Sequence, residues 1–286
     1  MAAEAAVVEA LRDARAARLG AGISLRRAHV ADAVVHCEAL DFVEIVADHY
    51  FIPAPAKNAE LAALAERFTV IPHGLDLSLG SAEGPSTPYL RKLAALVETL
   101  APPFWSEHVA FTRAGGRAVG HLAPLPFTHE ALDVLVRNIA QVRDAIPVPL
   151  IVENIACPFD VPQADMDEPE FLSRLVDRTG CGLLLDVANL CYNALNRGRD
   201  PFDALGGYPL HGVVQCHLAG GHRSHGEWID SHAFPVPEPV WELFEEVVRR
   251  APVGAAIVER DENLPPFREL ADEAARARRI LERRVP

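Results

Sequence analysis

Ionisable residues stand at the end of almost every short apolar run in this sequence, and they are the residues that could do chemistry. The runs TVIPHG, FWSEHVAF, PLIVENI, GLLLDVAN, VVQCHLAGG and AAIVERDEN carry, in order, His73; Glu107 and His108; Glu153; Asp186 and Asn189; His217; and Glu259 and Asp261. The segment WIDSHAFP, between the last two runs, adds Asp230 and His232 on what we expect to be a loop.

Burying an unpaired carboxylate costs several kcal/mol or forces its protonation. One such residue at a strand end is usually a hydrogen-bonded or capping residue. The set as a whole is different, because these segments contain almost no lysine or arginine apart from Arg260. We therefore predict that metal ions supply the missing positive charge.

Imidazoles and carboxylates, with no thiolate required, suit iron, manganese or zinc. So many carboxylates predict more than one ion, because a carboxylate can bridge two cations. Side chains alternate along a strand, so Asp186, His217 and Glu259 should share the inward face and Cys216 should point outward. The same alternation sets Glu107 opposite His108, and only one of these two should be a ligand.

Short apolar runs alternate with longer helical stretches along the whole chain. The expected strands are Ala21–Leu25, Asp41–Asp48, Phe68–Leu75, Phe104–Phe111, Val148–Ile155, Cys181–Asn189, Gly212–Gly221 and Gly254–Asn263. The expected helices include Ser86–Leu100, Thr128–Ile146, Glu168–Thr179 and Glu238–Arg250. Eight strands that alternate with helices predict a (β/α)₈ barrel, with an open doubly wound sheet as the alternative. In a barrel all strand C-termini face one side, so the ionisable residues would meet there.

Composition limits the classes of partner. The chain has 286 residues and a net charge of -13, which disfavours binding to nucleic acid or an anionic membrane because both surfaces are negatively charged. We expect one domain over residues 1–286, with an amphipathic helix over residues 1–20 before the barrel and neither a signal peptide nor a membrane span. The five cysteines are scattered and form no CxxC pair, which favours a reducing cytoplasm.

The chain resembles the multinuclear non-heme iron-dependent oxidative enzymes, a family once described only as a domain of unknown function that includes the oxidase of methanobactin biosynthesis. The resemblance is carried by HGLDLSLGSA, SEHVAF, LAPLPFTHEALD, IVENIACPF, TGCGLLLDVANLCYNALNRGRDP, CHLAGG and IDSHAFPVPEPVW, in this order and spacing. It implies a barrel of the xylose-isomerase type with two or three irons in mixed Fe(II)/Fe(III) states. Such enzymes use dioxygen to oxidise residues, often cysteine, of a ribosomally made precursor peptide that a small partner protein delivers.

The resemblance also implies roles for individual residues. The implied metal ligands are His73, His108, Glu153, Asp186, His217, Asp230, His232 and Glu259. Glu153 would bridge two ions, and Glu153, Asp186, Asp230 and His232 would act in catalysis. The residues expected around the ligands are Glu107, Asn189, Asp48, Arg260 and Asp261.

Two segments depart from the family pattern. Relatives often read ENY after the second strand, where this chain has Asp48, His49 and Tyr50, and EWDN at the eighth, where it has ERDEN. Arg260 could bind a substrate carboxylate, but we expect it to pair with Asp261 or Glu262.

Two other functions fit the same ligand types. One is a zinc or manganese hydrolase or isomerase, similar to endonuclease IV or to a sugar isomerase. An acidic chain without a basic stripe argues against the nuclease, and the lack of lysines near the strand ends argues against the isomerase. The other is a metal-binding protein without catalytic activity.

Overall fold

A computed structural model describes residues 18–283 of the chain, apart from residues 53 and 158. Eight parallel strands form its centre: β1 (Gly20–Ser24), β2 (Phe42–Val46), β3 (Thr69–His73), β4 (Trp105–His108), β7 (Leu150–Glu153), β8 (Gly182–Asp186), β9 (Val213–Ser224) and β11 (Ala255–Glu259). They are hydrogen-bonded in the order β9-β11-β1-β2-β3-β4-β7-β8, and pairing of β8 with β9 closes the ring. The predicted barrel is confirmed and the open sheet is wrong. Each barrel strand lies within or overlaps a predicted run.

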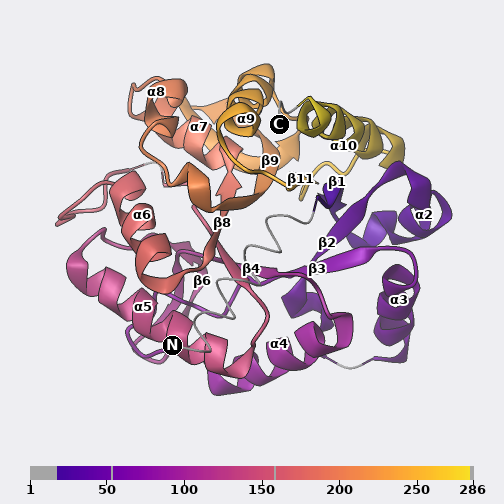
Figure 1. The fold of residues 1–286 in the computed structure, drawn as a ribbon, viewed down its shortest axis with the longest axis horizontal. Coiled ribbons are helices and arrows are strands. Elements are labelled where there is room, and N and C mark those ends of the chain that lie inside the picture. The colour runs from indigo at the N-terminus through magenta and orange to yellow at the C-terminus, as the bar shows by residue number, and fades with distance from the viewer. Residues whose placement is uncertain (1–17, 53, 158, 284–286) are drawn as a thin grey trace.

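Helices surround the barrel (Figure 1). They are α2 (Val30–Val35), α3 (Pro55–Ala65), α4 (Thr87–Leu100), α5 (His129–Ala145), α6 (Glu168–Thr179), α7 (Val187–Asn196), α8 (Pro201–Leu205), α9 (Glu238–Arg250) and α10 (Phe267–Glu282). The side chain of Thr128 accepts a hydrogen bond from the amide of Ala131 and caps α5, and Gly180, at φ 68°, ends α6. The helix predicted over residues 1–20 lies outside the described residues up to residue 17, and Gly20 already belongs to β1.

The barrel interior changes from apolar to polar along each strand. One buried cluster contains Phe42, Ile71, Ile151, Leu184 and Ile257. Two residues further along the same strands stand Glu44, His73, Glu153, Asp186 and Glu259, all buried. Because side chains alternate, these residues share the inner face and form a polar layer above the apolar one at the C-terminal ends of the strands.

Two antiparallel hairpins extend from the barrel. β5 (Phe111–Ala114) pairs with β6 (Arg117–Ala123), and β9 continues past the barrel to pair with β10 (Glu227–Phe234). Asp230 and His232 lie on β10, so the prediction that they belong to a loop was wrong. The pairing of β10 with β9 shifts register between Ile229 and Phe234, and this irregularity includes both residues.

Candidate metal centre

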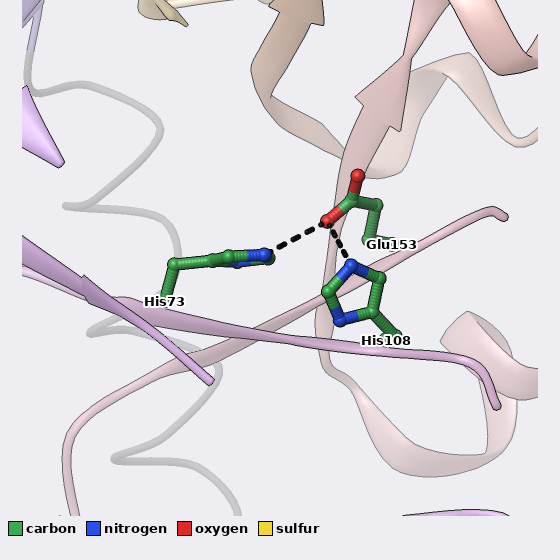
Figure 2. A group of neighbouring side chains, drawn as sticks. All are labelled: His73, His108 and Glu153. Carbon is green, nitrogen blue, oxygen red and sulfur yellow. Dashed lines mark ion pairs between the residues drawn. The ribbon is translucent and has the colours of Figure 1, made fainter. Parts of the chain in front are cut away.

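Two imidazole rings converge on one oxygen of Glu153 (Figure 2). The Oε2 atom of Glu153 lies 3.6 Å from Nε2 of His73 and 3.3 Å from Nε2 of His108. The three residues come from β3, β4 and β7, which are neighbours in the barrel, and the strand register places His108 directly beside Glu153. All three are buried. The arrangement matches two nitrogen ligands and one oxygen ligand around a single position.

The other oxygen of Glu153 faces a second group. Its Oε1 atom lies 3.3 Å from Nδ1 of His217, and Oε2 of Glu259 lies 3.1 Å from the same nitrogen. Asp186 stands beside His217 in the register of β8 and β9, and one donor atom from each of these four residues lies within 4.8 Å of the others. Glu153 thus presents one oxygen to each group, which is the geometry of a bridging carboxylate.

The hairpin pair lies at the edge of this cluster. Nε2 of His232 is 2.9 Å from Oδ2 of Asp230, and its Nδ1 is 3.6 Å from Oε2 of Glu259. Oδ2 of Asp261, beyond the end of β11, is 3.2 Å from the same Nδ1. The structure therefore brings all eight predicted ligands to one end of the barrel, with Asp230 and His232 on the outer side of Glu259.

The donor atoms of this cluster fit bound cations. Six of the buried polar atoms without a hydrogen-bond partner within the described residues lie here, namely Glu153 Oε2, Asp186 Oδ2, Asn189 Oδ1, His217 Nδ1, Asp230 Oδ1 and His232 Nδ1. Buried polar atoms normally have partners, so a concentration of such atoms in one place indicates a missing partner. The donors are nitrogen and oxygen atoms, and Cys216 packs outward in the apolar layer between barrel and helices, as predicted.

The clustered charges also shift the pKa values of several residues in this site. Burial raises the pKa of Asp186 well above its usual range, and the charges of Asp230 and Glu153 raise it further. Burial disfavours a charged His108, yet Glu153 and Glu107 raise its pKa to about 9. Burial likewise opposes protonation of His217, but Glu259, Glu44 and Glu153 hold its pKa well above normal. Without cations, the carboxylates thus draw protons onto the imidazoles, and metal binding would release those protons.

Several neighbours orient the histidines. The Oγ atom of Ser106 is 2.8 Å from Nδ1 of His73, and the carbonyl of Gly74 is 3.2 Å from Nδ1 of His108. Glu107 accepts hydrogen bonds from the backbone amides of Leu77 and His108, and its Oε1 atom lies 3.3 Å from Nδ1 of His108, whose Nε2 faces Glu153. His108, not Glu107, is therefore the member of that pair that faces Glu153.

The other residues expected around the ligands divide into two kinds. The backbone amide of Asn189 donates a hydrogen bond to the side chain of Asp186, and Asp261 contacts His232, so both residues touch candidate ligands. Asp48 instead accepts hydrogen bonds from the amide of Leu75 and the hydroxyl of Tyr89, which stabilises the loop after β3. Asp48 thus serves that loop rather than the ligands.

Arg260 does not pair as expected. It is buried, and its Nη2 atom lies 3.2 Å from Glu273 of α10. The residue after Glu259 faces the outside of the barrel because side chains alternate along β11. The predicted pairing of Arg260 with Asp261 or Glu262 was wrong, and Arg26, from the end of β1, is the arginine that binds Asp261.

Two buried polar residues of the barrel were not predicted. Glu44 and Gln215 are fully buried, and Gln215 donates a hydrogen bond of 2.7 Å to Glu44, which also lies 3.1 Å from Nε2 of His217. Burial raises the pKa of Glu44, against the opposing effect of His217. The signal for Glu44 was present in the run FVEIV, where alternation sets the acid on the same face as Phe42.

Within the described part of the chain, no helix combines the length and apolar character that crossing a membrane requires. The cysteines are mostly buried, and no disulfide joins any of them in the described residues.

Solved structures of low sequence identity share the barrel. The structure of 3-keto-D-glucoside 4-epimerase YcjR from E. coli aligns with a TM-score of 0.55 at 13% identity, over 90% of this chain and 98% of that chain. A putative xylose isomerase from Rhodospirillum rubrum aligns with a TM-score of 0.53 at 12% identity, over 89% and 93%. These similarities show the xylose-isomerase-like barrel and nothing about the reaction.

Sequence relatives are much more similar. A UPF0276 protein of Streptomyces avermitilis is 43% identical over 272 residues, which cover 93% of this chain and 55% of that protein, so the chain spans about half of this relative's length. A UPF0276 protein of Rhizorhabdus wittichii is 40% identical, over 90% of this chain and 93% of that protein. The family model described as "RiPP precursor modification enzyme MbnB/TglH/ChrH" matches residues 20–282. This match indicates an enzyme, and the chain belongs to the MbnB/TglH/ChrH family of RiPP precursor modification enzymes.

Proposed function

We propose that this protein is a multinuclear non-heme iron enzyme that uses dioxygen to oxidise a ribosomally made precursor peptide at cysteine. The observation that carries the metal part is Glu153, whose two oxygens face two separate groups of buried nitrogen and oxygen donors. Family membership supports a peptide substrate. Nitrogen and carboxylate donors without thiolates suit iron.

The proposed ligands divide by position. His73 and His108 would hold one ion together with Glu153, and Asp186, His217 and Glu259 would hold a second through the other Glu153 oxygen. Asp230 and His232 would hold a third ion or complete the second site. When bound, iron supplies the redox chemistry and a Lewis acid for a substrate thiolate.

The chain's own residues would position and protect the centre. Ser106 and Gly74 orient the imidazoles of His73 and His108 from behind. His217 and Asp186 are fully buried, so little water reaches the inner donors. Asp230 and His232 are the most exposed of the proposed ligands, with 13% and 16% of their side chains accessible. Substrate would therefore approach from the hairpin side.

The proposed function also implies a partner protein and a cellular location. We expect a small partner protein that delivers the peptide, a cytoplasmic location, and a single domain over residues 1–286. The scattered cysteines support the reducing location, since no disulfide joins them in the described residues.

Metal analysis after anaerobic, reducing purification tests the function. We expect at least two iron per chain, a Mössbauer signal from ferric iron, and oxygen uptake that depends on a cysteine-containing precursor peptide. A protein that is fully active with zinc or manganese and inert with iron would contradict the proposal and favour a hydrolase or isomerase. Bound iron with no oxygen uptake toward any such peptide would favour a metal-binding protein without catalysis.

A further inference from the structure

Glu44 is a fully buried carboxylate of the barrel that is not among the proposed ligands. It lies on β2, its side chain has no accessible surface, and its Oε1 atom has no hydrogen-bond partner among the described residues. Its near neighbours are Nε2 of His217, at 3.1 Å, and the side-chain amide nitrogen of Gln215, which donates to Glu44 at 2.7 Å and also lies 3.2 Å from that Nε2. Burying a carboxylate with an unpaired oxygen costs free energy of folding, so its presence at this position indicates a function.

The ring of His217 joins Glu44 to the candidate metal centre. Its two nitrogens face different groups: Nε2 faces Glu44, and Nδ1 faces Glu153 at 3.3 Å and Glu259 at 3.1 Å. A neutral imidazole carries one hydrogen, so one nitrogen donates a hydrogen bond and the other offers a lone pair. A carboxylate at Nε2 favours the hydrogen there and leaves the lone pair of Nδ1 for a cation.

His217 differs in this respect from the other two inner histidines. In His73 and His108 the outer contact, to Ser106 and to the Gly74 carbonyl, is made by Nδ1, and Nε2 faces Glu153. In His217 the roles of the two nitrogens are exchanged. Glu44 is a carboxylate, as is Glu107, which lies 3.3 Å from Nδ1 of His108, and a carboxylate partner makes the imidazole a stronger electron donor.

We propose that Glu44, held in place by Gln215, is a positioning residue that keeps the hydrogen of His217 on Nε2 and directs Nδ1 to the metal. The metal consequence rests on the proposed function, whereas the position of the hydrogen can be measured separately. Partners of this kind commonly change metal affinity by about 10–100-fold when they are removed.

The experiment uses the full chain with ¹⁵N-labelled histidine and zinc as a diamagnetic probe. Long-range ¹H–¹⁵N spectra report which nitrogen of each ring carries hydrogen and which binds the ion, and His217→Gln identifies the His217 signals. In the zinc-loaded wild type we expect hydrogen on Nε2 of His217 and zinc on Nδ1. His73 and His108 should show the opposite arrangement.

Variants at Glu44 separate charge from shape. Glu44→Gln keeps a hydrogen-bond acceptor, so it should retain the arrangement of His217 and lower zinc affinity at one site by severalfold. Glu44→Leu removes the acceptor and should lower that affinity by about 10–100-fold. Glu168→Gln, at a carboxylate on α6 that pairs with Tyr208 outside the centre, is the matched control and should bind zinc as the wild type does.

Two results would overturn the role of Glu44: hydrogen on Nδ1 of His217 in the zinc-loaded wild type, or unchanged zinc affinity in both Glu44 variants. If Glu44→Leu does not fold, the wild-type spectrum and Glu44→Gln still decide the question. Failure of the wild type to bind either zinc or iron would refute the metal centre itself, which is a different outcome from zinc binding with the reversed arrangement.

Discussion

His73, His108 and Glu153 end three adjacent barrel strands, whereas Asp230 and His232 lie on a hairpin strand, β10, that pairs with β9 at the edge of the sheet. The strand-end residues occupy regular, hydrogen-bonded backbone in a closed sheet. His232 has a φ of 50°, which is unusual for a residue other than glycine, and it lies within a register shift. The hydrogen-bonded sheet fixes the donor residues of the barrel. A few individual contacts to the segment after β11 hold the donor residues of the hairpin.

The contacts that hold His232 come from Asp261, two residues beyond the end of β11. The amide of Asp261 donates to the carbonyl of His232 at 2.8 Å, and the Asp261 side chain contacts the His232 ring. Arg26 in turn binds Asp261. A strained backbone persists only where its surroundings hold it, so this chain of contacts keeps His232 beside Glu259. The comparison indicates a rigid inner part of the centre and a more adjustable outer part.

The largest effect should come from the residue that both inner groups share. Glu153→Gln keeps the shape of the side chain but removes its charge, so we expect it to lose most of the bound iron and to reduce turnover to background. The barrel should remain folded, because the change also removes one of several clustered buried charges. Iron analysis, circular dichroism and a turnover assay on one preparation check this, and full iron with near-normal turnover would make Glu153 structural.

An intermediate effect should come from the hairpin. His232→Ala should lose about one ion per chain and leave the ions held by the strand-end residues. Turnover should fall much further than iron content, because the lost ion would leave the exposed side from which substrate approaches. Iron counting and single-turnover assays measure both quantities. Unchanged iron and unchanged turnover would show that His232 only stabilises the hairpin, and equal loss of all ions would contradict the division into a rigid and an adjustable part.

The smallest effect concerns Glu168, a half-buried carboxylate outside the centre. Burial raises the pKa of Glu168 to about 7, although Tyr208 donates a hydrogen bond to it. The unfolded chain ionises this group near 4.5, so the folded protein binds the extra proton between these values and loses stability as pH rises through them. Glu168→Gln should therefore match the wild type near pH 4.5 and exceed its free energy of unfolding by about 1–2 kcal/mol above pH 7, after allowance for partial exposure.

Urea denaturation of both proteins at pH 4.5 and pH 8 provides the measurement. A pH-independent difference would mean that Glu168 is not protonated in the folded state. The contrast with the centre is chemical: a single half-buried carboxylate such as Glu168 can take up a proton, whereas several clustered, buried carboxylates need cations.

Much of the barrel and of the site followed from local pattern. Alternation along single strands predicted that Asp186, His217 and Glu259 point inward and that Cys216 points outward, because this property depends only on the neighbouring residues of one strand. The parallel direction of the strands predicted that these residues meet at one end, since the chain returns through a helix between them. The existence of the polar layer was therefore contained in the sequence.

Other features depended on contacts between distant segments. Glu44 and His217 are far apart in sequence, and barrel closure together with the turn of one imidazole ring decides that Nε2 faces Glu44. Arg260 pairs with Glu273 because α10 packs beside β11, and the sequence around Arg260 offered nearer acids. The segment around Asp230 and His232 was predicted as a loop because it is polar, and its irregular pairing with β9 leaves no regular alternation in the sequence. Side-chain direction along a strand is a local property, but the partner that a side chain meets is set by how the whole chain closes.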